Sequence, residues 1–154
     1  MKILAISLNG CICITMIVVV DSNVIYSGLY SRRGASFQIL RAIRNNKLVP
    51  AISVALLEEY CDVMGRPALA EVFSRTERDA FADYLCSVGL LTEIFFLWRP
   101  FLKDPKDDMV LEVAVAAGAE LIITHNIKDF RGIEAFGLNA VQPDVVLKRK
   151  EYLK

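Results

Sequence analysis

The sequence predicts an α/β fold, a three-layer α/β/α domain around a central parallel sheet of about five strands. Strand-like and helix-like segments alternate along the whole chain, an order typical of parallel sheets with helices on both faces. Residues 16–20 form an unbroken apolar and mostly β-branched run, typical of a strand buried on both faces. No repeat or linker divides the 154 residues, so a single domain over residues 1–154 is expected.

The other elements follow in order along the chain. Further strands are expected at 48–52, 92–98, 120–124 and 138–143, where short apolar runs are bounded by turn residues. Helices are expected around the apolar stripe of Phe37, Leu40 and Ile43, after a cap at Ser53, after a capping box at Thr76 and Asp79 with its end at Gly89, and from a cap at Asp107 to Gly118. The core should span about residues 16–147, with residues 1–15 as a candidate N-terminal extension.

The N-terminal segment superficially resembles a signal peptide, because Lys2 precedes a mostly apolar run that reaches Val20. No small-residue cleavage site follows this run, and Asn9 and Gly10 interrupt it. Its length of roughly 18 residues is marginal for a membrane-spanning helix. A soluble, cytoplasmic protein with no membrane partner is therefore expected.

The net charge and the cysteine spacing argue against two other classes of protein: one that holds nucleic acid by an overall basic charge, and one built on cysteine-bound zinc or a CxxC pair. The 18 basic and 18 acidic residues cancel, so a global basic field cannot be the way this chain holds nucleic acid. Any RNA contact must then come from a local patch, from metal ions or from a second subunit. The cysteines form no CxxC pair and no zinc-like spacing with His125, so we expect buried thiols at Cys11, Cys13, Cys61 and Cys86.

Acidic residues lie at the carboxyl ends of the predicted parallel strands. Ligands of such sheets bind beyond the carboxyl ends of the strands. Asp21 follows the first core strand, and residues 124–130 (THNIKDF) follow the strand at 120–124. On the helix after Ser53 the apolar face consists of Leu56, Leu57, Tyr60, Val63 and Met64. Glu59 lies about 100° from the centre of this face and can reach inward, whereas Glu58 lies about 160° away, in solvent.

A second acidic group begins the helix that leads into the strand at 120–124. Asp107 and Asp108 could both cap this helix, and we assign capping to Asp107. Asp108 and Glu112 are four residues apart, so their charges repel unless a cation joins them. We interpret Glu112 as a solvated or supporting carboxylate. Hard cations such as Mg²⁺ or Mn²⁺ prefer such oxygen ligands and hydrolyse phosphodiesters without a serine, cysteine or histidine nucleophile.

With these residues the chain resembles the PIN domain family, and most closely its toxin-like members from toxin–antitoxin systems. The resemblance lies in residues 18–29 (VVVDSNVIYSGL), 52–67 (ISVALLEEYCDVMGRP), 104–124 (DPKDDMVLEVAVAAGAELIIT) and 124–130, and spans about residues 16–147. It implies a ribonuclease that requires Mg²⁺ or Mn²⁺, acts on RNA, forms a homodimer and is silenced by a cognate antitoxin.

The same resemblance assigns roles to individual residues. Asp21 and Asp108 would hold metal with Glu59 beside them, while Asn23 and Thr124 would orient ligands and the scissile phosphate. The sequence departs from the family at Asn126, where the family often has an acid. Asp129 follows about one helical turn later and could supply the missing carboxylate.

Other functions remain open from the sequence. The departure at Asn126 favours a catalytically weakened PIN-like module that binds RNA or protein without cutting. An aspartyl-phosphate enzyme of the haloacid dehalogenase type needs an acid two residues after Asp21, where Asn23 stands. A toxin and a housekeeping RNA-processing enzyme would look alike. Arg32, Arg33, Arg41 and Arg44 could contact phosphate or simply cover an exposed face.

Overall fold

A computed structural model describes residues 3–6, 12–149 and 153. The strands are β1 (Ile3–Ile6), β2 (Ile12–Val20), β3 (Leu48–Ile52), β4 (Leu90–Leu91), β5 (Leu121–Ile123) and β6 (Asn139–Val141). The helices are α1 (Ser22–Tyr30), α2 (Ala35–Arg44), α3 (Val54–Met64), α4 (Pro67–Ala70), α5 (Arg75–Val88), α6 (Pro105–Ala117) and α7 (Pro143–Lys148), with 3₁₀ turns at Ile127–Phe130 and Ile133–Phe136.

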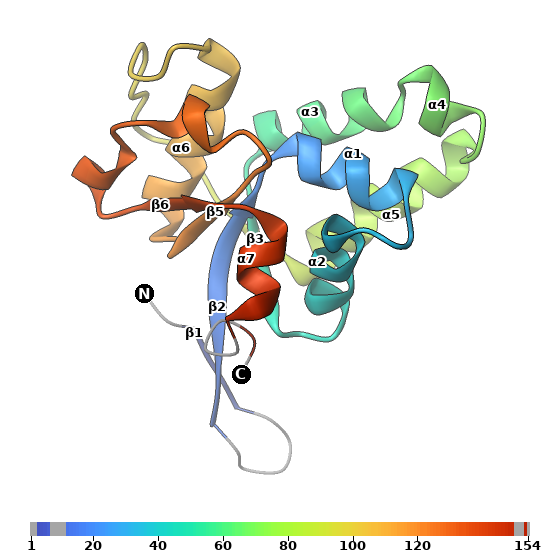
Figure 1. The fold of residues 1–154 in the computed structure, drawn as a ribbon, viewed down its shortest axis with the longest axis horizontal. Coiled ribbons are helices and arrows are strands. Elements are labelled where there is room, and N and C mark those ends of the chain that lie inside the picture. The colour runs from blue at the N-terminus through green and yellow to red at the C-terminus, as the bar shows by residue number, and fades with distance from the viewer. Residues whose placement is uncertain (1–2, 7–11, 150–152, 154) are drawn as a thin grey trace.

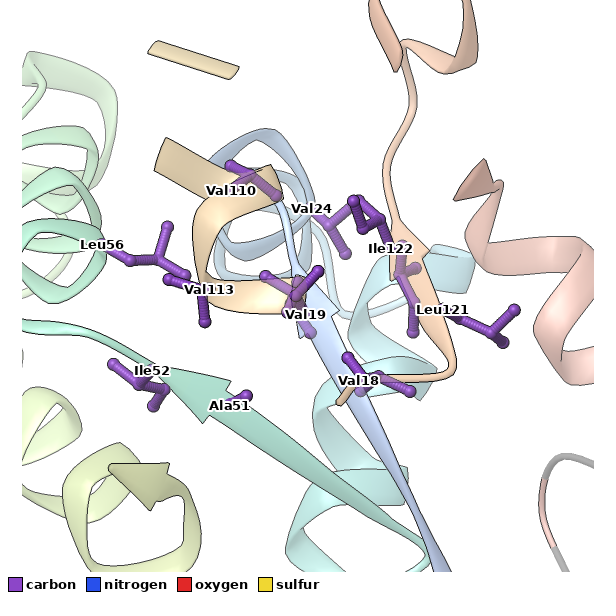
Figure 2. Packing of buried hydrophobic residues seen from close by; sticks show 14 of the residues in the cluster. Val18, Val19, Val24, Ala51, Ile52, Leu56, Val110, Val113, Leu121 and Ile122 are labelled. Carbon is purple, nitrogen blue, oxygen red and sulfur yellow. The ribbon is translucent and has the colours of Figure 1, made fainter. Parts of the chain in front are cut away.

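The central sheet is parallel and has the strand order β4-β3-β2-β5-β6, which confirms the predicted three-layer α/β/α class. Helix α6 packs against β2, β3 and β5, and Figure 2 shows its Val110 and Val113 beside Val19 of β2. Residues 17–20 are completely or almost completely buried, as expected for a strand covered on both faces. Among the described helices, none has the length and apolar content of a membrane span.

The first core strand is longer than predicted. It begins at Ile12 rather than at residue 16, and its first part pairs antiparallel with β1. Figure 1 shows this hairpin projecting from the body of the molecule, away from α1 and α3. Residues 1–2 and 7–11 of the candidate extension lie outside the described residues.

The prediction of a strand at 92–98 is wrong. Its place in the sheet is taken by Leu90 and Leu91, which pair with Ala51 and Ile52. The amide of Thr92 still donates to the carbonyl of Ile52, and then β3 ends, so the following residues have no strand to pair with. They run on as an irregular, exposed segment.

Three further expectations need correction. Helix α1 was not predicted at all, although residues 18–29 were assigned to the opening family motif. The capping box of α5 is formed by Ser74 and Glu77, not by Thr76 and Asp79. Cys61 is exposed and Cys86 is half-buried, whereas Cys11 and the side chain of Cys13 lie outside the described residues. The cap of α3 is as predicted, since Ser53 Oγ accepts from the amide of Leu56 at 3.2 Å.

Candidate active site

A cleft of about 250 Å³ lies at the carboxyl end of β2, where α1, α3, α6 and the loop after β5 meet. Most of its lining is polar and comes from segments far apart in the sequence. Its carboxylates are Asp21, Glu59, Asp104, Asp107 and Asp129, its amides are Asn23 and Asn126, and its cations are Arg66 and Lys106. The structure therefore brings together three of the four predicted catalytic acids with Asp107, which was predicted to cap α6, and Asp104, which had no predicted role.

Asp21 is held in place by the ends of two adjacent strands. Its amide donates to the carbonyl of Ile123, and its Oδ2 accepts from Thr124 Oγ1 at 2.7 Å and from Asn23 Nδ2 at 2.9 Å. The side chain is 7% exposed. Burial raises its pKa, with a further rise from the charge of Glu59, and the hydrogen bond from Thr124 opposes that rise. Asn23 and Thr124 thus lie where they orient this carboxylate.

Glu59 faces the cleft as its helical position predicted. It is half-buried and its Oε1 accepts from Ser22 Oγ at 3.3 Å, while Glu58 is exposed. Tyr60, which is next on α3, is fully buried and donates from its hydroxyl group to the carbonyl of Val20. Helix α3 is therefore tied to the strand end that carries Asp21.

The cap of α6 predicted at Asp107 lies at Asp104 in the structure. Helix α6 is capped by Asp104, whose Oδ1 accepts from the amide of Lys106 at 2.9 Å, and Pro105 occupies the first helical position. Asp107 therefore does not cap the helix, and it lines the cleft. Burial, followed by the charges of Asp21, Asp104, Asp129 and Asp108, raises the pKa of Asp107 to about 7.

Asp108 does not line the cleft. It has no exposed surface, and its Oδ1 accepts from the amides of Leu102 at 2.7 Å and Phe101 at 3.3 Å. The cation that compensates Glu112 is the guanidinium of Arg99, which forms two hydrogen bonds to it at 2.8 and 2.9 Å. Asp108 and Glu112 therefore organise the segment before α6.

The loop after β5 contributes two residues to the cleft. Thr124 is fully buried, and its Oγ1 accepts from the amide of Asn126 at 3.0 Å. Asn126 and Asp129 both line the cleft, so either can offer it an oxygen. His125 turns away, with its Nε2 2.8 Å from the hydroxyl of Ser36 and its amide donating to Asn23 Oδ1.

The sequence reasoning missed the cations of the cleft. Arg66 precedes α4 and Lys106 lies in the first turn of α6. Both lie within the segments that resemble the family, but the resemblance assigned no role to either residue. Asp104 could have been found, because Asp followed by Pro is a strong helix-start signal. Arg41 and Arg44 instead border a separate, mainly apolar groove with Phe37.

The donor set of this cleft fits a hard divalent cation. All its candidate ligands are oxygens, and their crowding disfavours the charged form of Asp107 in the absence of a counter-ion. Among the described residues, no three histidine, cysteine or acidic side chains are arranged to enclose a metal ion. Mg²⁺ retains several waters and takes only one or two carboxylates directly, so it does not need such an enclosure.

The fold and the cleft define an α/β/α protein with an acidic site at the carboxyl edge of a parallel sheet. The sequence model of the PIN domain family matches residues 17–128, and the chain belongs to that family. This membership indicates a nuclease-type module of a family that acts on RNA and typically uses divalent metal ions. No curated protein sequence matches the chain.

Proposed function

We propose that this protein is a Mg²⁺- or Mn²⁺-dependent endoribonuclease that cuts RNA in the cytoplasm. The observation that carries the proposal is the convergence of Asp21, Glu59, Asp107 and Asp129 on one cleft from four separate segments. Carboxylates that lie this close together repel one another. A bound divalent cation compensates that repulsion, so such a cluster indicates a cation site.

Asp21, Asp107 and Asp129 are the residues that would hold the cation, with Glu59 beside them. A divalent ion bound there would supply an activated water and stabilise charge on the phosphate during hydrolysis. Thr124 and Asn23 keep the Asp21 carboxylate oriented through their hydrogen bonds to Oδ2. Arg66 and Lys106 offer positive charge to the phosphates of the substrate.

Cleavage of a labelled RNA in Mg²⁺ or Mn²⁺ tests the activity. Asp21→Asn should abolish cleavage, and Glu59→Gln should reduce it by about 100-fold or more. Glu58→Gln is the matched control on the same helix, because Glu58 is exposed and lies outside the cleft. Cleavage by Asp21→Asn at the wild-type rate would contradict the proposal.

The alternative is a PIN domain that binds RNA or protein with weakened catalysis. Asn126 supports it, since an amide in the cleft keeps an oxygen ligand but carries no charge. Wild-type protein that binds RNA but leaves it uncut in both metals would favour this alternative.

The role of a toxin with a cognate antitoxin is a further part of the proposal. Induced expression should arrest growth through Asp21, and co-expression of a small antitoxin encoded beside the gene should restore growth. Arrest that persists with Asp21→Asn would contradict the toxin role.

We also propose a homodimer. Val54, Leu91, Phe95, Phe96 and Leu97 are 62–87% exposed, and together they offer on the order of several hundred Å² of apolar surface. Phe95→Glu should shift the mass in sedimentation from dimer to monomer. A wild-type monomer at micromolar concentration would contradict this part.

A further inference from the structure

A row of side chains leads from the cleft along helix α1. Ser22 lines the cleft and donates to Glu59, and Tyr26 and Tyr30 follow at intervals of four residues. Side chains four residues apart lie on the same face of a helix. The buried face of α1 is formed by other residues, namely Val24, Ile25 and Gly28.

The two tyrosine rings of this row are parallel. Their centroids are 6.0 Å apart and their planes differ by 9°, which is an offset stacking geometry. Tyr26 is half-buried, whereas Tyr30 is 64% exposed. A pair that served only to pack the helix would cover its rings, and Tyr30 leaves most of its surface to solvent.

Arg66 joins this row to the cleft. Its guanidinium lies over the ring of Tyr26, 5.7 Å from the centroid, and the same side chain lines the cleft. Within the part of the chain that the structure describes, no carboxylate forms an ion pair with Arg66. Its charge is thus not neutralised by a partner beside the acidic site.

The other end of the row is also basic. Arg32 and Arg33 follow Tyr30 in the turn after α1, and both are exposed. From the cleft outward, the order is therefore the cation of Arg66, the rings of Tyr26 and Tyr30, and the cations of Arg32 and Arg33. Proteins that bind single-stranded nucleic acid combine basic groups along the backbone with aromatic rings on which bases stack.

We propose that Tyr26, Tyr30 and Arg66 form a stacking subsite for the bases of single-stranded RNA beside the cleft. A ring can stack on a base only if the base is free, and bases within a duplex are already stacked on each other. The inference rests on the proposed function in taking RNA as the substrate, and it adds a preference for unpaired RNA next to the cut.

Fluorescence anisotropy with a labelled oligouridylate of about 12 nucleotides tests the subsite in Mg²⁺. All variants carry Asp21→Asn, so that binding is measured apart from cleavage. Tyr30→Ala should weaken binding roughly tenfold, and Tyr30→Phe should bind like the parent because it keeps the ring. The duplex of the same strand with oligoadenylate should bind more weakly and should not respond to Tyr30→Ala.

Two more variants separate stacking from general effects. Phe101→Leu removes an exposed aromatic ring that is neither on α1 nor in the proposed dimer surface, and it should leave binding unchanged. Arg66→Gln should weaken binding and make it less dependent on salt. Thermal unfolding checks that Tyr30→Ala is folded, as expected for an exposed side chain.

The outcomes for the subsite and for the nuclease are distinct. Equal affinity of Tyr30→Ala and the parent, a preference for the duplex, or no binding to the oligouridylate would each overturn the subsite. Failure of the protein that retains Asp21 to cleave the oligonucleotide in Mg²⁺ or Mn²⁺ would overturn the nuclease assignment, while the stacking measurement in the Asp21→Asn background would still stand.

Discussion

Thr124 donates a hydrogen bond of 2.7 Å to Asp21 across 103 positions of the sequence. The two residues directly follow the ends of neighbouring parallel strands, β5 and β2, so the sheet itself brings them together. This contact holds one oxygen of the central carboxylate and opposes the pKa rise that burial causes.

Thr124→Val should therefore impair the site without altering the fold. The variant keeps the shape of the side chain but leaves Asp21 with one hydrogen-bond partner fewer, so the pKa of Asp21 should rise. We expect metal affinity to fall by about 10- to 100-fold, measured by calorimetric titration with Mn²⁺. Thr124→Ser keeps the hydroxyl and should retain most of the affinity.

Asp107→Asn and Asp108→Asn should separate the two acids of α6. Asp107 lines the cleft, so its amide variant should bind Mn²⁺ about 10- to 100-fold more weakly. Asp108→Asn retains an oxygen for the amides of Leu102 and Phe101 and should change the affinity little. The opposite order would show that Asp108, and not Asp107, binds the metal.

The stability of the cation-free protein should depend on pH through Asp107. Its pKa is raised from 3.8 to about 7, so between these values the folded protein holds a proton that the unfolded chain has released. Unfolding then becomes easier as the pH rises through this range. In EDTA, the Tm of Asp107→Asn should fall less with rising pH than the Tm of the wild type, and parallel curves would speak against the raised pKa.

Asp129 should matter more to the metal than Asn126. Both line the cleft, but only Asp129 brings a negative charge to a cation. Asp129→Asn should weaken Mn²⁺ binding more than Asn126→Ala does in the same titration. If Asn126→Ala has the larger effect, the side-chain amide of Asn126 is the metal ligand and Asp129 is not.

A chain that begins at Met16 should keep the core. The register of β2 with β3 starts at Met16, whereas residues 12–15 pair with β1 in the projecting hairpin. We expect a single cooperative thermal transition and unchanged metal affinity. A loss of cooperativity would show that the hairpin belongs to the folding unit.

The local signals of the sequence were reliable where the partner of a segment did not matter. The apolar run at 16–20 predicted the central strand, and the cap at Ser53 predicted the start of α3. Helical spacing alone placed Glu59 on the side of α3 that faces the cleft and Glu58 in solvent. The family motifs located Asp21 and Thr124 at adjacent strand ends.

Local signals failed where the outcome depended on a distant partner. Residues 92–98 have the composition of a strand, but β3 ends at Ile52 and offers them no further backbone to pair with. Helix α1 carries a glycine in its interior, a weak helix former, and a Cβ at Gly28 would lie 2.8 Å from Leu40 of α2. Close packing against α2, which the sequence does not reveal, makes that residue suitable there.

The sequence by itself determined the α/β order, the buried central strand and the family, because these follow from periodicity and from motifs within short segments. Only the tertiary structure decided which acid of α6 faces the cleft. The two side chains lie about 100° apart on the helix, and the packing of α6 leaves Asp107 in the cleft and Asp108 beneath the amides of Phe101 and Leu102. It also decided that Arg66 meets Tyr26 beside the site, because that contact joins two helices with no shared local pattern.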